Sequence, residues 1–320
     1  MFLKTIYFLS FSLLISSCGG STSSVNDVDD DSVSNSINET CFSLRINTKR
    51  CNFVHDGLER YYLIYTPSSL ANDMPLLFAL HGYGSSAEVH KSYTQYEDLA
   101  EQNNFIVVYP QGYKLESLLV NSSSHWNVGA WTSPSNIDDV DFIETIIDLI
   151  SNKYQINSSR IYSSGMSNGG FMSYHLACNL SRKIAAIASV TGSMSKETLA
   201  NCSPRHPTAI MQIHGMLDLV VPYEGYSELG IEPIDDVMNY WADINNCNPE
   251  RIEAIIDFTN TNNSVHLINY ESCANDVDVK LIRIPSMGHT WPDINNFNIS
   301  ATEEIWNFLS GYDLNGKIVN

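Results

Sequence analysis

The stretch that most constrains the fold is Gly-Met-Ser-Asn-Gly at residues 165–169, the only Gly-x-Ser-x-Gly in the chain. It follows a strand-like segment, residues 160–164, and precedes a helix-like segment, residues 170–178. A serine at a sharp turn between a strand and a helix has a strained backbone, so the residues around it must be small, as the two glycines are. This context is typical of a serine nucleophile. Ser167 is therefore the candidate nucleophile.

The rest of the folded part predicts strands that alternate with helices. Short apolar runs bounded by Gly, Pro, Asn or Ser are typical of strands buried on both faces, and amphipathic runs with early acids are typical of helices. We expect an α/β fold with a mostly parallel, doubly wound sheet flanked by helices. The expected strands are residues 58–65, 74–80, 105–109, 160–164, 184–190, 209–213 and 279–284, and the expected helices are residues 87–103, 142–150, 170–178 and 302–309.

The N-terminus has the pattern of an export signal. Lys4 precedes an apolar run that is too short to span a bilayer, and the run ends in Ser16-Ser17-Cys18. Small residues before a cysteine resemble the bacterial lipobox, so residues 1–18 are interpreted as a lipoprotein-type signal ending at a lipidated Cys18. An ordinary signal peptide is the alternative. We expect a protein anchored on the cell envelope, at the outer membrane or cell surface, or secreted.

Composition sets the domain boundaries and excludes some partners. Residues 19–40 are acidic and almost free of apolar side chains, which predicts a disordered tether, and residues 41–320 form one catalytic domain. The formal net charge of -19 argues against nucleic acid as a partner and leaves the lipid anchor as the only expected membrane contact. Because export implies an oxidising compartment, the six cysteines after Cys18 are expected to form disulfides. Pairing of sequence neighbours predicts Cys41 with Cys51, Cys178 with Cys202 and Cys247 with Cys273.

Chain order selects an acid and a base. Asp218 lies just past the predicted strand 209–213, at the sheet edge where ligands bind in open α/β folds. α/β-Hydrolases place the triad in the order serine, acid, histidine, and only His266 and His289 follow Asp218. His266 lies in an alternating, strand-like stretch, whereas His289 lies on the loop after the last strand. We therefore expect Asp218 and His289 to complete the triad.

Aromatic residues near these positions are candidate substrate contacts. Trp126 and Trp131 lie on a long loop, residues 110–137, and Trp291 is two residues past His289. Long loops in compact domains are more often functional than idle. The alternative for Trp126 and Trp131 is that they pin the loop to the core.

Four motifs in the correct order resemble the polyhydroxybutyrate depolymerase and feruloyl esterase family. They are His-Gly-Tyr-Gly at 81–84, Gly-Met-Ser-Asn-Gly-Gly at 165–170, the segment 214–223, and Gly-His-Thr-Trp-Pro at 288–292. The resemblance spans residues 58–292 and implies an α/β-hydrolase that acts as a serine carboxylesterase. One departure is Asp293, where the family often has glycine.

The implied chemistry needs neither a cofactor nor a metal. In the family's mechanism Ser167 attacks the ester, His289 accepts its proton, and Asp218 orients the histidine. The oxyanion would bind the backbone N–H groups of Asn168 and Tyr83.

Two alternative activities remain open at this stage, besides a non-enzymatic binding lipoprotein. The preferred substrates are soluble feruloyl, acetyl or other short-chain esters, because no separate polymer-binding domain follows the last predicted helix. The alternatives are a polyester depolymerase and a serine peptidase on the same fold.

Overall fold

The computed structural model describes residues 37–114, 123–133, 135–258 and 263–319. The predicted leader, Cys18 and the tether up to residue 36 lie outside the described residues. Part of the tryptophan-bearing loop, residues 115–122 and 134, also lies outside them.

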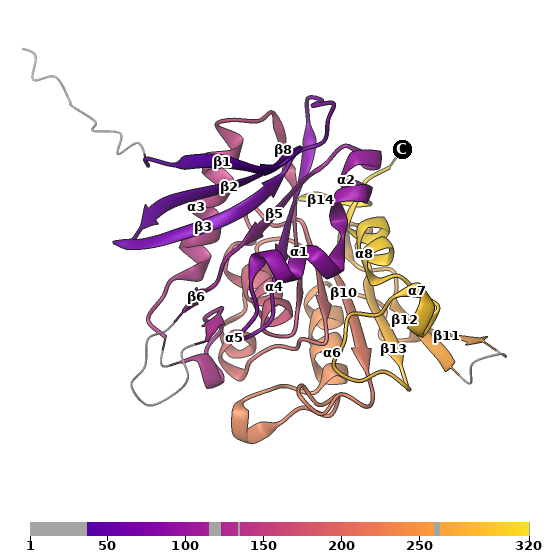
Figure 1. Cartoon of the computed structure of the whole chain (residues 1–320). Helices are drawn as coiled ribbons and strands as arrows, with labels where there is room; N and C mark the ends of the chain where they lie inside the picture. The colour runs from indigo at the N-terminus through magenta and orange to yellow at the C-terminus, as the bar shows by residue number, and fades with distance from the viewer. Residues whose placement is uncertain (1–36, 115–122, 134, 259–262, 320) are drawn as a thin grey trace, which may run out of the picture. The chain divides into compact units, whose positions relative to one another are not determined.

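An eleven-stranded sheet forms the centre of the domain (Figure 1). Its order is β1-β2-β3-β5-β4-β8-β9-β10-β13-β12-β11, and the run from β5 to β13 is parallel, with antiparallel strands on both sides. The strands are β1 (Thr40–Arg45), β2 (Thr48–His55), β3 (Leu58–Tyr65), β4 (Met74–Leu80), β5 (Ile106–Pro110), β8 (Ile156–Met166), β9 (Ala186–Val190), β10 (Ala209–Gly215), β11 (Arg251–Phe258), β12 (Asn263–Tyr270) and β13 (Val279–Ile284). Two short hairpins pair β6 (Tyr113–Lys114) with β7 (Ser124–His125) and β14 (Tyr312–Asp313) with β15 (Gly316–Lys317).

Helices cover both faces of the sheet, as the doubly wound prediction requires. In Figure 1, α1, α2 and α8 lie in front of the sheet, and α3, α4 and α6 lie behind it. The α-helices are α1 (Ala87–Thr94), α2 (Tyr96–Asn103), α3 (Asp139–Ser151), α4 (Asn168–Asn179), α5 (Lys196–Asn201), α6 (Ile234–Ile244), α7 (Ile294–Phe297) and α8 (Ala301–Leu309). Single 3-10 turns are η1 (Ala130–Thr132), η2 (Ser227–Leu229) and η3 (Ala274–Asp276).

The core lies where the apolar runs predicted it. Every residue of β4, β5, β9 and β10 is buried, because helices cover both faces of these central strands. Phe105 stacks on Trp306 of α8 with ring centroids 3.5 Å apart, which joins the front helices to the sheet. The predicted α/β-hydrolase architecture, with a mostly parallel sheet, is confirmed.

Several predicted boundaries differ from those of the structure, most clearly at residues 87–103 and at the start of the domain. The single helix expected over residues 87–103 is two helices, because Gln95 adopts the left-handed conformation (φ 51°) and breaks the backbone hydrogen-bond ladder. The tether was expected to extend to residue 40, yet β1 begins at Thr40 and the Glu39 carboxylate contacts Tyr62 and Lys153.

Three disulfides link the cysteines in the expected pairs. Cys41–Cys51 joins β1 to β2, Cys178–Cys202 joins the ends of α4 and α5, and Cys247–Cys273 joins the segment after α6 to the one after β12. Among the described residues, every helix is too short or too polar to cross a membrane.

Candidate active site

Ser167 occupies a strained turn between β8 and α4. Its backbone has φ 55° and ψ -124°, a region that costs a residue with a side chain about 1–3 kcal/mol. The turn is held because the Ser167 N–H donates to Val190 O of the neighbouring strand at 2.8 Å, and the Phe171 N–H donates to Ser167 O at 3.0 Å. The sequence motif therefore forms the sharp strand-to-helix turn that it predicted.

The glycines around Ser167 are required by close backbone approach. A Cβ at Gly165 would lie 2.3 Å from the carbonyl carbon of Gly169, and a Cβ at Gly169 would lie 2.1 Å from Leu80 O. Real Cβ atoms do not tolerate such distances. The helix α4 can therefore begin directly against β4 only because these positions lack side chains.

Asp218 and His289 form a hydrogen-bonded pair. His289 Nδ1 donates to Asp218 Oδ2 at 2.8 Å. The second carboxylate oxygen, Oδ1, accepts the backbone N–H groups of Val220 and Val221 at 2.9 Å each. Asp218 is 3% exposed, so its orientation is fixed from both sides.

The pair lies at the same sheet edge as Ser167. β8, β10 and β13 are parallel, so their carboxyl ends share one edge; Asp218 follows β10 by three residues, and His289 follows β13 by five. The two loops are tied together because the Leu217 N–H donates to Met287 O at 3.0 Å.

The electrostatic surroundings keep Asp218 ionised. Burial raises the pKa of the Asp218 carboxyl, but hydrogen bonds from His289, Val221 and Val220 and the His289 charge outweigh burial, and the pKa lies below its ordinary value. His214 also lies close to this carboxylate: the Nε2 atom of His214 is 3.6 Å from Oδ2 of Asp218. Burial lowers the pKa of His214 to about 4, so His214 is neutral at pH 7 and does not neutralise Asp218.

The tetrad 81–84 follows β4 and passes directly beside Ser167, the candidate nucleophile. A Cβ at Gly82 would lie 3.4 Å from Ser167 Cβ and 4.0 Å from its Oγ. The Gly82 carbonyl accepts hydrogen bonds from His81 Nδ1 at 2.8 Å and from the Ser85 N–H at 3.1 Å. Because the peptide is planar and trans, the Tyr83 N–H points the opposite way. Among the described residues it has no acceptor, and neither does the Asn168 N–H.

The side chain of Asn168 has a role that the sequence did not reveal. Its Oδ1 accepts the Trp126 backbone N–H at 2.7 Å, and its Nδ2 donates to Trp126 O at 3.1 Å. The Trp126 indole N–H donates to His81 O at 2.9 Å. Trp126 is 0% exposed, so it pins the loop to the core, the alternative given for it above, and does not contact a substrate. It joins the elbow, which is the turn at residues 165–169, to the tetrad.

The chain is similar to known esterases in sequence and in fold. Residues 68–229, half of its length, match the family described as phospholipase/carboxylesterase. The chain belongs to the phospholipase/carboxylesterase family. The expected kinship with feruloyl esterases is confirmed, and the depolymerase part of the resemblance stays a prediction.

Two relatives that are similar in sequence to this chain are esterases by name. A bifunctional acetylxylan esterase/xylanase, XynS20E, from Neocallimastix patriciarum is 27% identical over 82% of the chain, and feruloyl esterase B from Piromyces equi is 29% identical over 73%. The chain spans only 35% and 43% of their lengths. An acetyl xylan esterase from Aspergillus awamori has the same fold, with a TM-score of 0.54 at 17% identity, over 78% of this chain and 94% of that one.

The other two tryptophans that were candidate substrate contacts, Trp131 and Trp291, differ in exposure. Trp131 is half-buried and packs edge-on against Phe171 of α4, with ring centroids 4.7 Å apart, so part of its ring stays open. Trp291 was expected at the mouth of the site, but it is only 9% exposed. It packs among His90, Tyr93 and Tyr96, and its indole N–H donates to Thr302 Oγ1 at 3.1 Å.

Other polar clusters lie apart from the triad. The other histidine that follows Asp218, His266, donates from Nδ1 to Glu253 Oε1 at 2.7 Å, at the antiparallel edge of the sheet. Among the described residues, His55, Asp56 and Asp141 are placed to hold a metal ion, but they lie between β2 and α3. Glu39 also lies close to Cys41 and Cys51, whose thiols are in a disulfide.

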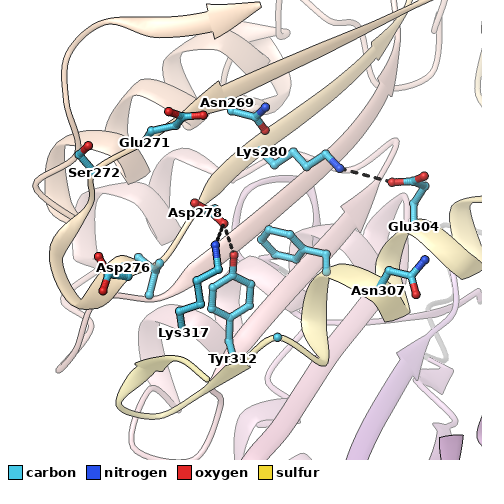
Figure 2. A pocket seen from close by; sticks show the side chains of 13 residues that line it. Asn269, Glu271, Ser272, Asp276, Asp278, Lys280, Glu304, Asn307, Tyr312 and Lys317 are labelled. Carbon is cyan, nitrogen blue, oxygen red and sulfur yellow. Dashed lines mark hydrogen bonds and ion pairs between the residues drawn. The ribbon is translucent and has the colours of Figure 1, made fainter. Parts of the chain in front are cut away.

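A cavity of about 670 Å³ also lies away from the triad (Figure 2). It is at the amino end of β13, where Lys317 pairs with Asp278 and Lys280 pairs with Glu304. Because His289 follows the opposite end of β13, this cavity is not part of the candidate active site.

Proposed function

We propose that this protein is a serine carboxylic ester hydrolase with Ser167 as nucleophile, His289 as base and Asp218 as acid. The single observation that carries the proposal is the 2.8 Å bond between His289 Nδ1 and Asp218, on the sheet edge that presents the strained Ser167. This bond leaves Nε2 of His289 as the nitrogen that accepts a proton.

The reaction proceeds through an acyl-enzyme. His289 Nε2 takes the proton of Ser167 as Oγ attacks the ester carbonyl, and Asp218 stabilises the imidazolium that forms. The same proton then passes to the departing alcohol oxygen as its bond to the acyl carbon breaks. In the second half, water attacks the acyl group, His289 takes one water proton, and that proton returns to Ser167 as the acid leaves.

The developing oxyanion binds backbone donors. The N–H groups of Asn168 and Tyr83 have no acceptors among the described residues. Asn168 follows Ser167 at the start of α4, and Tyr83 follows Gly82, which lies against Ser167. One such donor contributes about 10²–10³ in kcat in hydrolases of this type. The fixed Gly82 carbonyl supports Tyr83 in this role.

The proposed substrates are feruloyl, acetyl or other short-chain esters, including those carried on plant polysaccharides. The names of the two fungal relatives and the half-open ring of Trp131 beside α4 support this choice. A panel comparing aryl acetates, hydroxycinnamoyl esters, polyhydroxybutyrate granules and a peptide anilide tests it. Faster granule clearing would favour the depolymerase, and anilide cleavage would favour the peptidase.

Mutation of the triad tests the mechanism. We expect Ser167→Ala, His289→Ala and the double variant to lose similar amounts of kcat, about 10⁴–10⁶-fold, because the residues act as a unit. His266→Ala is the matched control, since His266 follows Asp218 in sequence but bonds to Glu253 instead. Additive losses, or an equal loss in His266→Ala, would count against the assignment.

We also propose that the protein is exported, with Cys18 lipidated. The three disulfides fit an oxidising compartment, and the leader pattern fits a lipoprotein. Cys18→Ser should move the protein from the detergent phase to the aqueous phase on phase partitioning. A wild-type protein already in the aqueous phase would contradict lipid anchoring.

A further inference from the structure

Two polar residues interrupt the buried strand β10. Gln212 and His214 are each 0% exposed, whereas the other residues of this strand are alanine, isoleucine, methionine and glycine. Because they are two positions apart, their side chains point to the same face of the sheet. A buried polar side chain is unfavourable unless its groups are hydrogen-bonded, and an apolar residue could fill the same space. The hydrogen bonds that these two residues make therefore indicate what they do.

Gln212 connects helix α4 to His214. Its Oε1 accepts the hydroxyl of Tyr174, a buried residue of α4, at 2.8 Å. Its Nε2 donates to Gly192 O and to His214 Nδ1, both at 2.9 Å. Because an amide nitrogen can only donate, Nδ1 of His214 is an acceptor and the ring carries its proton on Nε2. Gln212 thus sets the tautomer of His214.

His214 in turn holds the loop that carries Asp218. Its Nε2–H donates to the carbonyl oxygen of Val221 at 2.9 Å. The N–H of the same residue, Val221, donates to Asp218 Oδ1 at 2.9 Å. The other oxygen of Asp218, Oδ2, accepts the Nδ1–H of His289. A shift of Val221 would therefore turn the carboxylate away from His289.

His214 acts on this loop as a hydrogen-bond donor rather than as a charge. Besides Asp218 and His289, the titratable group that faces its ring is Tyr223, with ring centroids 5.9 Å apart. Burial lowers the pKa of His214 to about 4. At pH 7 the neutral ring contributes direction to the Val221 carbonyl and no net charge to the site.

We propose that His214 is a positioning residue of the triad. It holds Val221, and through Val221 the Asp218 carboxylate, at a fixed place relative to α4, the helix that begins directly after Ser167. The inference rests on the proposed esterase function, in which Asp218 orients His289. Such precision matters because a displacement of about 1 Å in a catalytic site can lower the rate about 100-fold.

Two carboxamide variants of His214 form a matched pair. The amide of His214→Asn overlies the Nδ1 half of the ring and ends short of Val221, whereas the longer side chain of His214→Gln can donate to Val221 O. With an aryl acetate, we expect His214→Asn to lower kcat about 10–100-fold with little change in KM, and His214→Gln to stay within about threefold of wild type. Thermal melts verify that both variants fold. Equal kcat values for the two variants would overturn the proposal.

The pH profile separates positioning from a merely structural role. If Asp218 is held less firmly, it stabilises the charged form of His289 less, and the base stays neutral to lower pH. The acidic limb of kcat/KM should therefore move down by about half a pH unit or more in His214→Asn, but not in His214→Gln. A structural defect would lower the rate at every pH without moving the limb, and that result overturns the proposal.

Two further variants complete the kinetic test. His55→Asn is the control, since His55 is a buried histidine that bonds to Asp141 between β2 and α3, and it should keep the wild-type kcat and acidic limb. Gln212→Met removes the donor to His214 Nδ1 and carries the test if His214→Asn does not fold. It should move the limb in the same direction, and an unmoved limb would count against the proposal.

Proton NMR tests the positioning without any substrate. A histidine Nδ1–H bonded to a carboxylate gives a resonance far downfield, which His289→Ala would assign by its loss. We expect wild type and His214→Gln to keep this resonance, and His214→Asn to broaden it or move it upfield. The comparison holds even if wild type hydrolyses no ester, so failure of the esterase function is distinguished from failure of this inference. An identical resonance in both His214 variants would overturn the positioning role.

Discussion

The Nδ1–H of His81 donates a hydrogen bond to the carbonyl oxygen of Gly82 at 2.8 Å and so fixes the direction of that carbonyl. The other ring nitrogen, Nε2, accepts the Gly112 N–H at 2.9 Å, which fixes the tautomer. Burial lowers the pKa of His81 to about 4, so the ring is neutral at pH 7. The histidine that opens the tetrad therefore orients a peptide group and takes no part in proton transfer.

His81→Leu should impair the proposed oxyanion site with little effect on substrate binding. The Gly82 carbonyl loses one partner, so the Tyr83 N–H is held less firmly, and we expect kcat to fall about 10–100-fold, below the full loss of one donor. Steady-state kinetics on an aryl ester, with a thermal melt to verify folding, measures this. Tyr83→Ala keeps the backbone donor and should lose less. A larger loss in Tyr83→Ala would instead assign the role to the Tyr83 side chain.

Gly169→Ala should destabilise the fold by at least about 3 kcal/mol, because its Cβ would lie 2.1 Å from Leu80 O and force the elbow away from β4. Gly288→Ala is the control next to His289, since a Cβ there meets nothing closer than Leu217 O at 3.6 Å. Urea unfolding measures both variants. A Gly169→Ala protein as stable as Gly288→Ala would contradict the close packing of the elbow.

Buried neutral histidines should make stability fall as the pH drops. Burial lowers the pKa values of His81 and His214 to about 4, whereas an unfolded histidine titrates near 6.5. Between these two pKa values the unfolded chain binds more protons than the folded chain. The contribution of these histidines to the free energy of unfolding is therefore at its maximum above about pH 6.5 and decreases as the pH falls toward 4. Each histidine contributes a slope of up to about 1.4 kcal/mol per pH unit.

Urea unfolding at pH 7.5, 6.5, 5.5 and 4.5 gives this slope. His214→Gln should reduce the slope of unfolding free energy against pH by the contribution of one histidine, up to about 1.4 kcal/mol per pH unit, because the buried ring of His214 stays neutral in the folded state. Keeping the pH at 4.5 or higher leaves most carboxylates ionised, including Asp218, whose pKa is lowered. Equal slopes for wild type and His214→Gln would show that this histidine is protonated without cost in the folded protein.

The two tryptophans of the long loop should respond differently to mutation. Trp126→Phe leaves His81 O without its indole donor and opens a small cavity, so we expect a loss of about 2–4 kcal/mol in stability. Trp131→Ala should instead raise KM for a hydroxycinnamoyl ester more than for an acetate, since part of its ring is open. Comparing urea midpoints and KM values for both variants measures the difference. Equal effects of Trp131→Ala on KM for the two esters would show that Trp131 does not contact the acyl group.

Local sequence signals predicted the parts of the site that are set by backbone geometry. The glycines of the elbow, the position of Asp218 after β10 and that of His289 after β13 all follow from strand ends and chain order. The three disulfide pairs agree with pairing between sequence neighbours.

Side-chain direction could not be predicted in the same way. Whether Trp126 faces solvent or the core depends on Asn168, which is 42 residues away and holds both backbone polar groups of Trp126. The division of residues 87–103 into α1 and α2 likewise depends on Gln95, a residue that has no turn signal in the sequence. Such outcomes are decided by tertiary contacts, which local patterns do not encode.

The Cys41–Cys51 bond has a mechanical consequence. Among the described strands, β1 lies at the edge of the sheet and pairs with β2 alone, and Thr40 and Cys41 are its first residues. A pulling force applied through Ile37 would unzip β1 from β2 one hydrogen bond at a time, which is the weak direction of a hairpin. The Cys41–Cys51 bond lies one residue inside the end of β1 to which the force is applied, so the separation of β1 from β2 stops there. The force then acts on the hydrogen bonds between β2 and β3.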